Sequence, residues 1–484
     1  MNANRGNAFI LLIVLLIMSY PTINTTDSSP KDEQAREEFQ TIIARHPPTN
    51  YTEDWSQACS SVIVTGNATK DGRAILMKNR DLPDERVNIP IYVPAALGKY
   101  AYVGVNTNAM GINEKGLAVM NTYLPALAGS NPIEGNLLLN QMIMEYYESV
   151  SEVAQALNNS HSPIGPVHRV SLGNVATCVG VVDRFGDGAF FEISNTKAYV
   201  QHVVDGYDSR ANHPRIFPGL SSGPSGRDQY LLDALDEVYN KYGFITPKHV
   251  MQNISRYVHH KELGSTNFSI DGEACNLNTV ATMVAVSGDE RYEGLLNSMW
   301  TACGMSPLVG LFVPSMVCAE IIPESIEDLW LHSLNKFRSA RAQPITTEWL
   351  LYPERVRELQ NYAFFTEDYT VEAYQHLMST VPEGLADNQI RETIRTFVES
   401  MCNYASEIYL EETTNVEAPP IIEFATPTTS TSPTSTSTTT IGFTDPTSSP
   451  SETLYDDQLI LLTIGAVSGF VLVIIAMVIK ERLT

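Results

Sequence analysis

A cysteine followed directly by an apolar run is the residue of this chain best suited to nucleophilic chemistry. Cys59 precedes the β-branched run 60–64, and a second apolar run, 74–77, leads into Asp81. The segment between the two runs ends in Asp71-Gly72, a pair typical of tight turns, so the stretch predicts a β-hairpin. Such a hairpin brings Asp81 back to within a few residues of Cys59. We therefore expect a thiol and a carboxylate to face one site.

Cys59 could act without a histidine if it were the first residue of the mature chain. A free cysteine thiol has a pKa of about 8.5 and is mostly protonated at neutral pH. An α-amino group, with a pKa of about 7.7–8.0, can serve as its base. This chemistry requires that everything before Cys59 be removed.

The segment from Cys59 to Asp81 resembles the start of the N-terminal-nucleophile (Ntn) hydrolases. It is most similar to the cysteine branch that holds the choloylglycine (bile salt) hydrolases and the isopenicillin N acyltransferases. Residues 110–119 resemble the hairpin that these families place next, and residues 211–214 resemble their Asn-bearing motif. The resemblance extends to about Pro314. It implies an α+β, four-layer αββα sandwich and acyl transfer through a thioester, with no cofactor and no metal.

The resemblance also implies roles for particular residues. Cys59 is the nucleophile and Asp81 orients its α-amine. Lys78 and Arg80 compete for the basic role beside the thiol. Choloylglycine hydrolases carry an arginine three residues before the aspartate, and here Lys78 holds that place. The alternative to a catalytic role is that Cys59 is a small buried residue at the start of a strand, and that Lys78 and Arg80 are solvated residues on the next strand.

Two asparagines are candidate donors to the carbonyl oxygen under attack. Asn212 matches the motif that supplies an oxyanion-hole donor, and Asn121 matches the substrate-side asparagine of the family. Each side-chain amide offers two N–H groups for the charge that develops on that oxygen. Arg291 is a candidate for the late arginine of the family. His213, next to Asn212, also suggests a Cys-His protease, but the sequence that flanks the cysteine of papain-like enzymes is absent.

Both ends of the chain are hydrophobic, and they predict different things. Residues 1–20 have the short apolar run of a signal peptide. Residues 458–479 are long enough to cross a bilayer, and the basic tail 480–484 would lie in the cytoplasm. The Ser/Thr/Pro-rich stretch 416–457 predicts a disordered stalk. We therefore expect an exported enzyme, held at the cell membrane by one helix, with its catalytic domain outside the cell.

The remaining segments divide into a pro-segment (21–58), a catalytic core (59–322) and a helical extension (323–415) that packs on the core or forms a lid. In the core we expect strands at 60–65, 73–80, 100–107, 110–112, 117–122, 175–182, 189–193, 279–286 and 294–300, and helices at 135–157, 227–242 and 246–260. The pro-segment must be cut before Cys59, by the chain itself or by another protease.

The charge of the chain excludes one class of partner. A formal net charge of −24 argues against nucleic acid, whose phosphates require a basic face. Six Asn-x-Ser/Thr sequons fit a glycoprotein. The five cysteines other than Cys59 are either all buried thiols or form at most two disulfides. The function expected is cleavage of a linear amide in an acylated amine or an acylated amino acid. The alternatives are a dipeptidase of the same superfamily and an inactive cell-surface binding module.

Overall fold

The computed structural model describes residues 59–424, except for 83–87, 106–107, 129–134, 225, 258–274, 276–278, 341–352 and 383–384. The expected signal peptide, pro-segment, membrane helix, cytoplasmic tail and most of the stalk lie outside the described residues. No helix within the described ranges is both long and apolar enough to span a bilayer. Every described residue falls within one compact unit.

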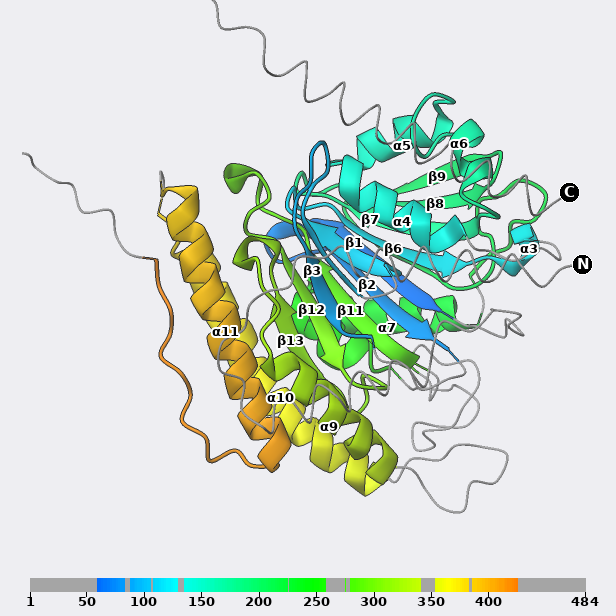
Figure 1. Cartoon of the computed structure of the whole chain (residues 1–484). Helices are drawn as coiled ribbons and strands as arrows, with labels where there is room; N and C mark the ends of the chain where they lie inside the picture. The colour runs from blue at the N-terminus through cyan, green and yellow to red at the C-terminus, as the bar shows by residue number, and fades with distance from the viewer. Residues whose placement is uncertain are drawn as a thin grey trace, which may run out of the picture. The chain divides into compact units, whose positions relative to one another are not determined.

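Two antiparallel sheets form the centre of this unit (Figure 1). The first sheet has the order β10-β1-β2-β11-β12-β13, with strands β1 (Ser60–Gly66), β2 (Gly72–Asp81), β10 (Tyr207–Arg210), β11 (Thr279–Val286), β12 (Ser298–Cys303) and β13 (Leu311–Ser315). The second has the order β3 to β9, with β3 (Pro90–Val93), β4 (Tyr102–Val105), β5 (Met110–Asn113), β6 (Ala118–Tyr123), β7 (Ala176–Val182), β8 (Gly188–Ser194) and β9 (Ala198–Val203). The expected mixed fold with antiparallel sheets is confirmed.

Helices cover the outer faces of both sheets. On the second sheet lie α3 (Pro125–Ala128), α4 (Gly135–Tyr146), α5 (Val150–Asn158) and α6 (Pro166–Ser171), and on the first sheet lie α7 (Arg227–Tyr242), α8 (Pro247–His249), the π-helical turn η1 (Val250–Ile254), α9 (Ser325–Ala340), α10 (Pro353–Ser379) and α11 (Asp387–Glu411). Short 3₁₀ turns span Glu290–Tyr292 and Val317–Ala319. The layers therefore run helix, sheet, sheet, helix.

Hydrophobic contacts hold these layers together. Leu76 of β2 lies with Met120 and Phe190 of the second sheet in one cluster between the sheets. Its strand neighbour Met77 points the other way, into a cluster with helices α7 and α9 to α11. Because β2 is buried on both faces, its residues 74–77 are a continuous apolar run rather than an alternating one.

The hairpin predicted at the nucleophile is confirmed, but its turn differs. β1 and β2 pair from Ser60 opposite Asn79 to Gly66 opposite Gly72, so the chain turns through residues 67–71 and not about Asp71-Gly72. Gly66 has a φ of +53°, and a Cβ at this position would collide with Asp205. The wider turn therefore needs glycine where it leaves β1.

Several elements depart from the sequence expectation. The helix expected over 135–157 is two helices, because the Ser149 side chain accepts a hydrogen bond from the Glu152 N–H and starts a new helix there. The closing strand expected at 294–300 begins at Ser298. Strands β3, β9, β10 and β13 were not predicted. β10 is short and polar (Tyr-Asp-Ser-Arg), so it lacks the apolar run that marks a strand.

Helices α9 to α11 share the core of the first sheet. A buried ion pair joins Arg256, just after η1, to Glu367 of α10, with 2.6 Å between Nη2 and Oε1. The Glu367 carboxylate also accepts the Phe312 N–H of β13, and the Arg256 guanidinium lies over the rings of Phe312 and Phe364. A buried charge pair is tolerated when its remaining hydrogen bonds are made, as they are here. The expected helical extension is packed on the core.

Glu412 carries a testable pH dependence. It follows α11, and Arg355 of α10 and Lys336 of α9 both bind its carboxylate. The bonds from Arg355, followed by that from Lys336, lower the pKa of Glu412 from 4.5 to about 2. A carboxyl with a depressed pKa stabilises the fold above its unfolded pKa, and this stability is lost as the pH falls towards the folded pKa.

We therefore expect Glu412→Gln to lower the free energy of unfolding at pH 7 by about 1–2 kcal/mol, a value discounted for partial exposure. The difference from the wild type should shrink as the pH falls from about 5 towards 2. Urea unfolding at several pH values measures it. Glu411→Gln, at the exposed neighbouring position, is the control. Equal losses for Glu412→Gln at pH 7 and pH 3 would contradict the assignment.

Candidate active site

The Cys59 nitrogen is held by an asparagine that is distant in sequence. Cys59 directly precedes β1. Because Ser61 pairs with Arg210 in an antiparallel ladder, Cys59, two residues before Ser61, lies opposite Asn212, two residues after Arg210. The Cys59 backbone N–H donates to Asn212 Oδ1 at 2.6 Å. In the full chain this nitrogen belongs to the Ala58–Cys59 peptide bond, and in a chain starting at Cys59 it would be the α-amine.

The orientation of the Asn212 amide follows from its two partners. Its Nδ2 donates to the Tyr123 carbonyl oxygen at 2.7 Å, while its Oδ1 accepts from the nitrogen of Cys59. If the amide oxygen and nitrogen were exchanged, the NH₂ group would face the Cys59 N–H and the oxygen would face the Tyr123 carbonyl oxygen. Neither hydrogen bond could then form. Asn212 thus holds the nitrogen next to the nucleophile, a contact that the sequence analysis did not foresee. Its expected role as an oxyanion-hole donor stays a prediction.

Lys78 reaches from the first sheet to the second beside the nucleophile. Its side chain is fully buried and interacts with the Cys59 thiol. Its Nζ also donates to the backbone oxygen of Asn121 and lies 3.3 Å from Asn121 Oδ1. Burial lowers the pKa of Lys78, although the neighbouring Cys59 and Asp81 act in the opposite direction. Lys78 therefore links the thiol to the asparagine on β6.

The contact with Lys78 also orients the side chain of Asn121. Because the amide oxygen faces the ammonium group, the amide nitrogen of Asn121 is directed away from Lys78. That nitrogen carries two N–H groups. This arrangement fits the donor role expected for Asn121, which stays a prediction.

Asp81 is buried at the end of β2 and has two partners that the sequence analysis missed. Arg227, the first residue of α7, places its Nη1 2.9 Å from Asp81 Oδ2. The Thr279 hydroxyl donates to Oδ1 at 2.6 Å. Thr279 pairs with Asp81 in the sheet, so a strand prediction with the correct register could have found it. The expected role of Asp81 at the α-amine stays a prediction.

The other two basic candidates have different partners. Arg80 is buried, and its Nη1 donates to Asn88 Oδ1 at 3.3 Å. Arg291 lies beyond Val286, which is the end of β11 opposite to the one at Asp81, and its exposed side chain pairs with Asp289. Eight strand residues span about 25 Å. The expectation that Arg291 serves as the late arginine of the site is therefore wrong.

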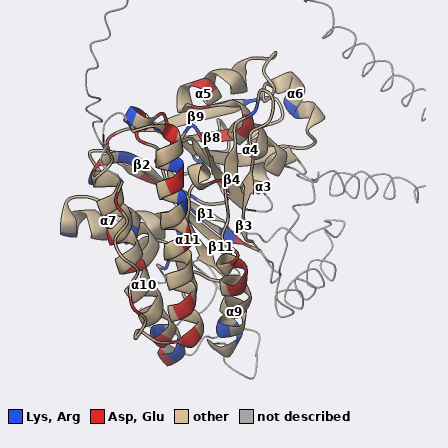
Figure 2. Cartoon of the chain, turned by 60° about the vertical axis from the view of Figure 1, so that its left-hand side comes forward, with Lys and Arg blue, Asp and Glu red and all other residues tan. Residues whose placement is uncertain are grey.

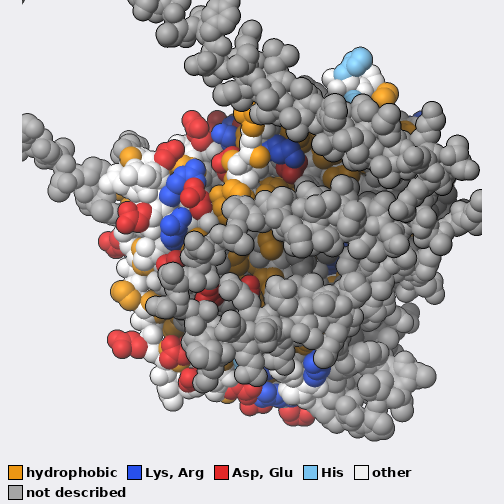
Figure 3. All heavy atoms as spheres, viewed as in Figure 1, with side chains coloured by type: hydrophobic (Ala, Val, Ile, Leu, Met, Phe, Trp, Pro, Cys, Tyr) orange, Lys and Arg blue, Asp and Glu red, His pale blue; other side chains and the backbone are white. Residues whose placement is uncertain are grey.

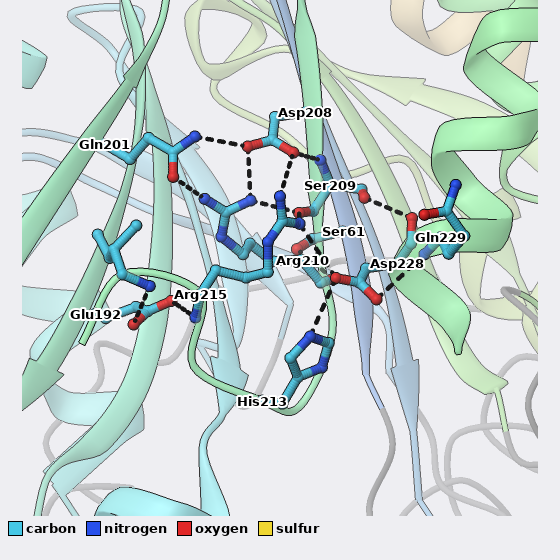
Figure 4. A network of polar contacts seen from close by, with 11 residues as sticks. Ser61, Glu192, Gln201, Asp208, Ser209, Arg210, His213, Arg215, Asp228 and Gln229 are labelled. Carbon is cyan, nitrogen blue, oxygen red and sulfur yellow. Dashed lines mark hydrogen bonds and ion pairs between the residues drawn. The ribbon is translucent and has the colours of Figure 1, made fainter. Parts of the chain in front are cut away.

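The residues that flank Asn212 in the sequence, Arg210 and His213, belong to a polar network that Figure 4 shows. The Arg210 guanidinium pairs with Asp208 at 2.7 Å, bonds to Gln201 and stacks on the Phe190 ring. His213 points to Asp228, with Nε2 and Oδ2 3.3 Å apart. His213 is therefore an element of this network, which disfavours a Cys-His protease. All six cysteines are buried and free, in agreement with the buried-thiol alternative.

Charged residues are spread over the helices that cover the first sheet (Figure 2), and Figure 3 shows hydrophobic side chains next to charged ones on the face seen there. Lys and Arg lie interspersed with Asp and Glu along α9, α10 and α11 in Figure 2. A nucleic-acid partner would need a face dominated by basic residues. These helices carry both signs of charge, and the expectation that nucleic acid is not a partner stays a prediction.

Comparison with known proteins agrees with this geometry. Residues 67–264 match the family model described as acyl-coenzyme A:6-aminopenicillanic acid acyl-transferase. No curated protein matches the chain. The match confirms, for residues 67–264, the resemblance to the group of Ntn enzymes that holds the choloylglycine hydrolases and the isopenicillin N acyltransferases.

Solved structures with similarity to the chain include two hydrolases. A mutant of the conjugated bile acid hydrolase of Clostridium perfringens is 17% identical, with a TM-score of 0.32, over 50% of this chain and 88% of that one. The penicillin V acylase of Agrobacterium tumefaciens is 12% identical, with a TM-score of 0.27, over 53% of this chain and 86% of that one. Superpositions with TM-scores this low carry no argument of their own.

Lys78 yields a prediction about the pH dependence of activity. If the charged ammonium supports the thiol and Asn121, activity falls as the pH rises through the lowered pKa of Lys78. Lys78→Arg keeps the charge at higher pH, so it should extend activity towards alkaline pH. Lys78→Met should lower kcat/KM at every pH, by about 100-fold. Profiles of kcat/KM between pH 6 and 10 measure both effects. An unchanged alkaline limb in Lys78→Arg would show that Lys78 does not set it.

Proposed function

We propose that the protein is a membrane-anchored N-terminal cysteine amidohydrolase or acyltransferase, on the premise that residues 67–264 match the acyl-transferase family model. Its substrate is a linear amide, either an acylated amine or an acylated amino acid. The observation that carries this proposal is the bond from the Cys59 nitrogen to Asn212, with Lys78 next to the thiol. The proposed nucleophile (the Cys59 thiol), its base (the Cys59 nitrogen after cleavage) and a cation (Lys78) then lie together at the start of β1.

The chemistry follows from these positions. The α-amine of Cys59 takes the proton of the thiol, and the sulfur attacks the carbonyl carbon of the amide. The Asn121 amide nitrogen stabilises the charge on the carbonyl oxygen. The C–N bond breaks, the leaving amine takes the proton from the α-ammonium group, and a thioester remains on Cys59. Water or a second amine then attacks the thioester and restores the thiol.

The nucleophile gains its base only when the Ala58–Cys59 bond is cut. In a self-cleaving route, the Cys59 sulfur attacks the Ala58 carbonyl carbon, the C–N bond breaks, and the nitrogen takes a proton. Water then hydrolyses the resulting thioester and leaves a carboxyl group on Ala58. Asn212 already accepts the N–H of that nitrogen in the full chain. The same contact therefore serves cleavage of the chain and, later, turnover.

Cys59→Ala tests the nucleophile. We expect complete loss of amidase activity and, if processing is autocatalytic, retention of residues 21–58. Intact mass and terminal peptide mapping give the first residue, and a panel of N-acyl amino acids, acylated amines and dipeptides gives the activity. Cys303→Ala, a buried thiol in β12, is the control. Wild-type activity in Cys59→Ala, or a wild-type chain that starts near residue 20, would contradict the mechanism. Cleavage of dipeptides alone would favour the dipeptidase.

Export and anchoring form a second part of the proposal. They are supported by the apolar runs within 1–20 and 458–479, and by three sequon asparagines, Asn67, Asn158 and Asn253, whose side chains are exposed. A chain that ends at residue 457 should appear in the culture medium, whereas the full chain should stay with the membrane fraction. Release of both chains, or retention of both, would contradict anchoring by the C-terminal segment.

A further inference from the structure

We propose that Glu192 is a positioning residue that fixes the loop carrying Asn212, and through it the nitrogen of Cys59. We call residues 211–217 the Asn212 loop. The inference rests on the proposed function, because it assigns a task within that active site. Among the described residues, the hydrogen bonds of the Glu192 side chain go to Arg215, Ile216 and Phe217, not to Cys59 or Asn212, and nothing in the sequence pattern marks Glu192.

The Glu192 carboxylate binds three successive backbone N–H groups. Oε1 accepts from Arg215 at 2.5 Å, and Oε2 accepts from Ile216 at 3.0 Å and from Phe217 at 2.7 Å. Glu192 is fully buried. Hydrogen bonds to an ionised acceptor are roughly twice as strong as those between neutral groups. This side chain therefore holds the backbone of the Asn212 loop itself.

The direction of Glu192 connects the two sheets. On β8, Phe191 and Ile193 face the helices of the second sheet, so Glu192, between them, faces the first sheet. The loop that it binds continues from β10, the edge strand of the first sheet. Figure 4 shows Glu192 beside Arg215 on one side of the network. Glu192 therefore fastens an extension of one sheet to an interior strand of the other.

The side chain of Arg215 fastens the same loop a second time. Its Nη1 lies 3.1 Å from Asp228 Oδ2, on α7, and its Nη2 lies 3.6 Å from Asp208 Oδ1, on β10. Glu192 therefore binds the backbone of the Asn212 loop, whereas the Arg215 side chain ties the loop to α7 and β10 through its ion pairs. Asn212 is only three residues before Arg215, so a shift of the loop moves the Oδ1 atom that accepts from Cys59.

Removing the charge at residue 192 should disturb this contact more than it disturbs binding of the substrate. In Glu192→Gln one carboxylate oxygen becomes an NH₂ group, which would face backbone N–H groups of the loop. The pairing of Lys78 with Asn121 comes from β2 and β6, so it does not depend on the loop. The effect should therefore fall on steps that use the nitrogen of Cys59.

The experiment compares Glu192→Gln and Glu192→Asp with the wild type. We expect Glu192→Gln to lower kcat by about 10- to 100-fold, as small misplacements of catalytic groups do, and to change KM less than about threefold. Glu192→Asp, which keeps the charge, should recover part of kcat. A weaker Asn212 contact favours the protonated α-amine less, so the acid limb of the kcat profile should move to lower pH in Glu192→Gln.

Glu367→Gln is the matched control, because Glu367 is an equally buried carboxylate that accepts a backbone N–H but pairs with Arg256 instead of binding the Asn212 loop. It should lower thermal stability and leave the acid limb in place. All activities are measured well below the melting temperature of each variant. Equal kcat losses in Glu192→Gln and Glu367→Gln, with both acid limbs unmoved, would overturn the positioning role.

A second readout separates this inference from the proposed function. The rate at which iodoacetamide alkylates Cys59 reports the surroundings of the thiol without any substrate. A changed rate in Glu192→Gln but not in Glu367→Gln supports the positioning role even if the wild type cleaves no amide in the panel, a result that would defeat the proposed function alone. Unchanged rates in both variants would overturn the positioning role alone.

Discussion

The antiparallel pairing of β10 with β1 is the constraint on which the site depends. Because the two strands place Ser61 opposite Arg210, the residues beyond their ends, Cys59 and Asn212, meet as well. A shift of one residue would turn every side chain of a strand to the other face of the sheet. The register therefore fixes both the distance from Asn212 to the nitrogen and the side of the sheet on which the thiol lies.

That pairing in turn requires buried charge to be compensated between the sheets. β10 has little apolar surface, and its Arg210 is fully buried. Asp208, Gln201 and the Phe190 ring surround its guanidinium, while Glu192 and Arg215 secure the loop that follows. Removing one member would leave a buried charge without its partner, which usually costs several kcal/mol. The polar network takes the place of the hydrophobic packing that holds the other strands.

The sequence predicted the parts of the site whose signals are local. The hairpin at Cys59 and Asp81 has two apolar runs and a turn, so its strands could be located without the structure. The polar strand β10 could not, because nothing in its four residues shows that Arg210 will be buried among polar partners. Contacts across the sheets, such as Lys78 with Asn121, depend on packing between distant segments and leave no mark in either segment. The same limit applies to Asn212. Its motif identified the residue but not which end of its amide faces Cys59. That orientation depends on the Tyr123 carbonyl oxygen, at the end of β6, which binds the amide nitrogen.

The strand order also determines when, during synthesis of the chain, the strands around Cys59 can pair. β2 lies between β1 and β11, so the hairpin that bears the nucleophile is completed on its open side only by residues made about two hundred positions later. Pairings of such large sequence separation form late in folding. Until the growing chain has passed residue 212, Cys59 lacks Asn212, and until it has passed residue 286, the sheet lacks β11. The surroundings of Cys59 are therefore complete only in a chain that has been made at least as far as the end of β11.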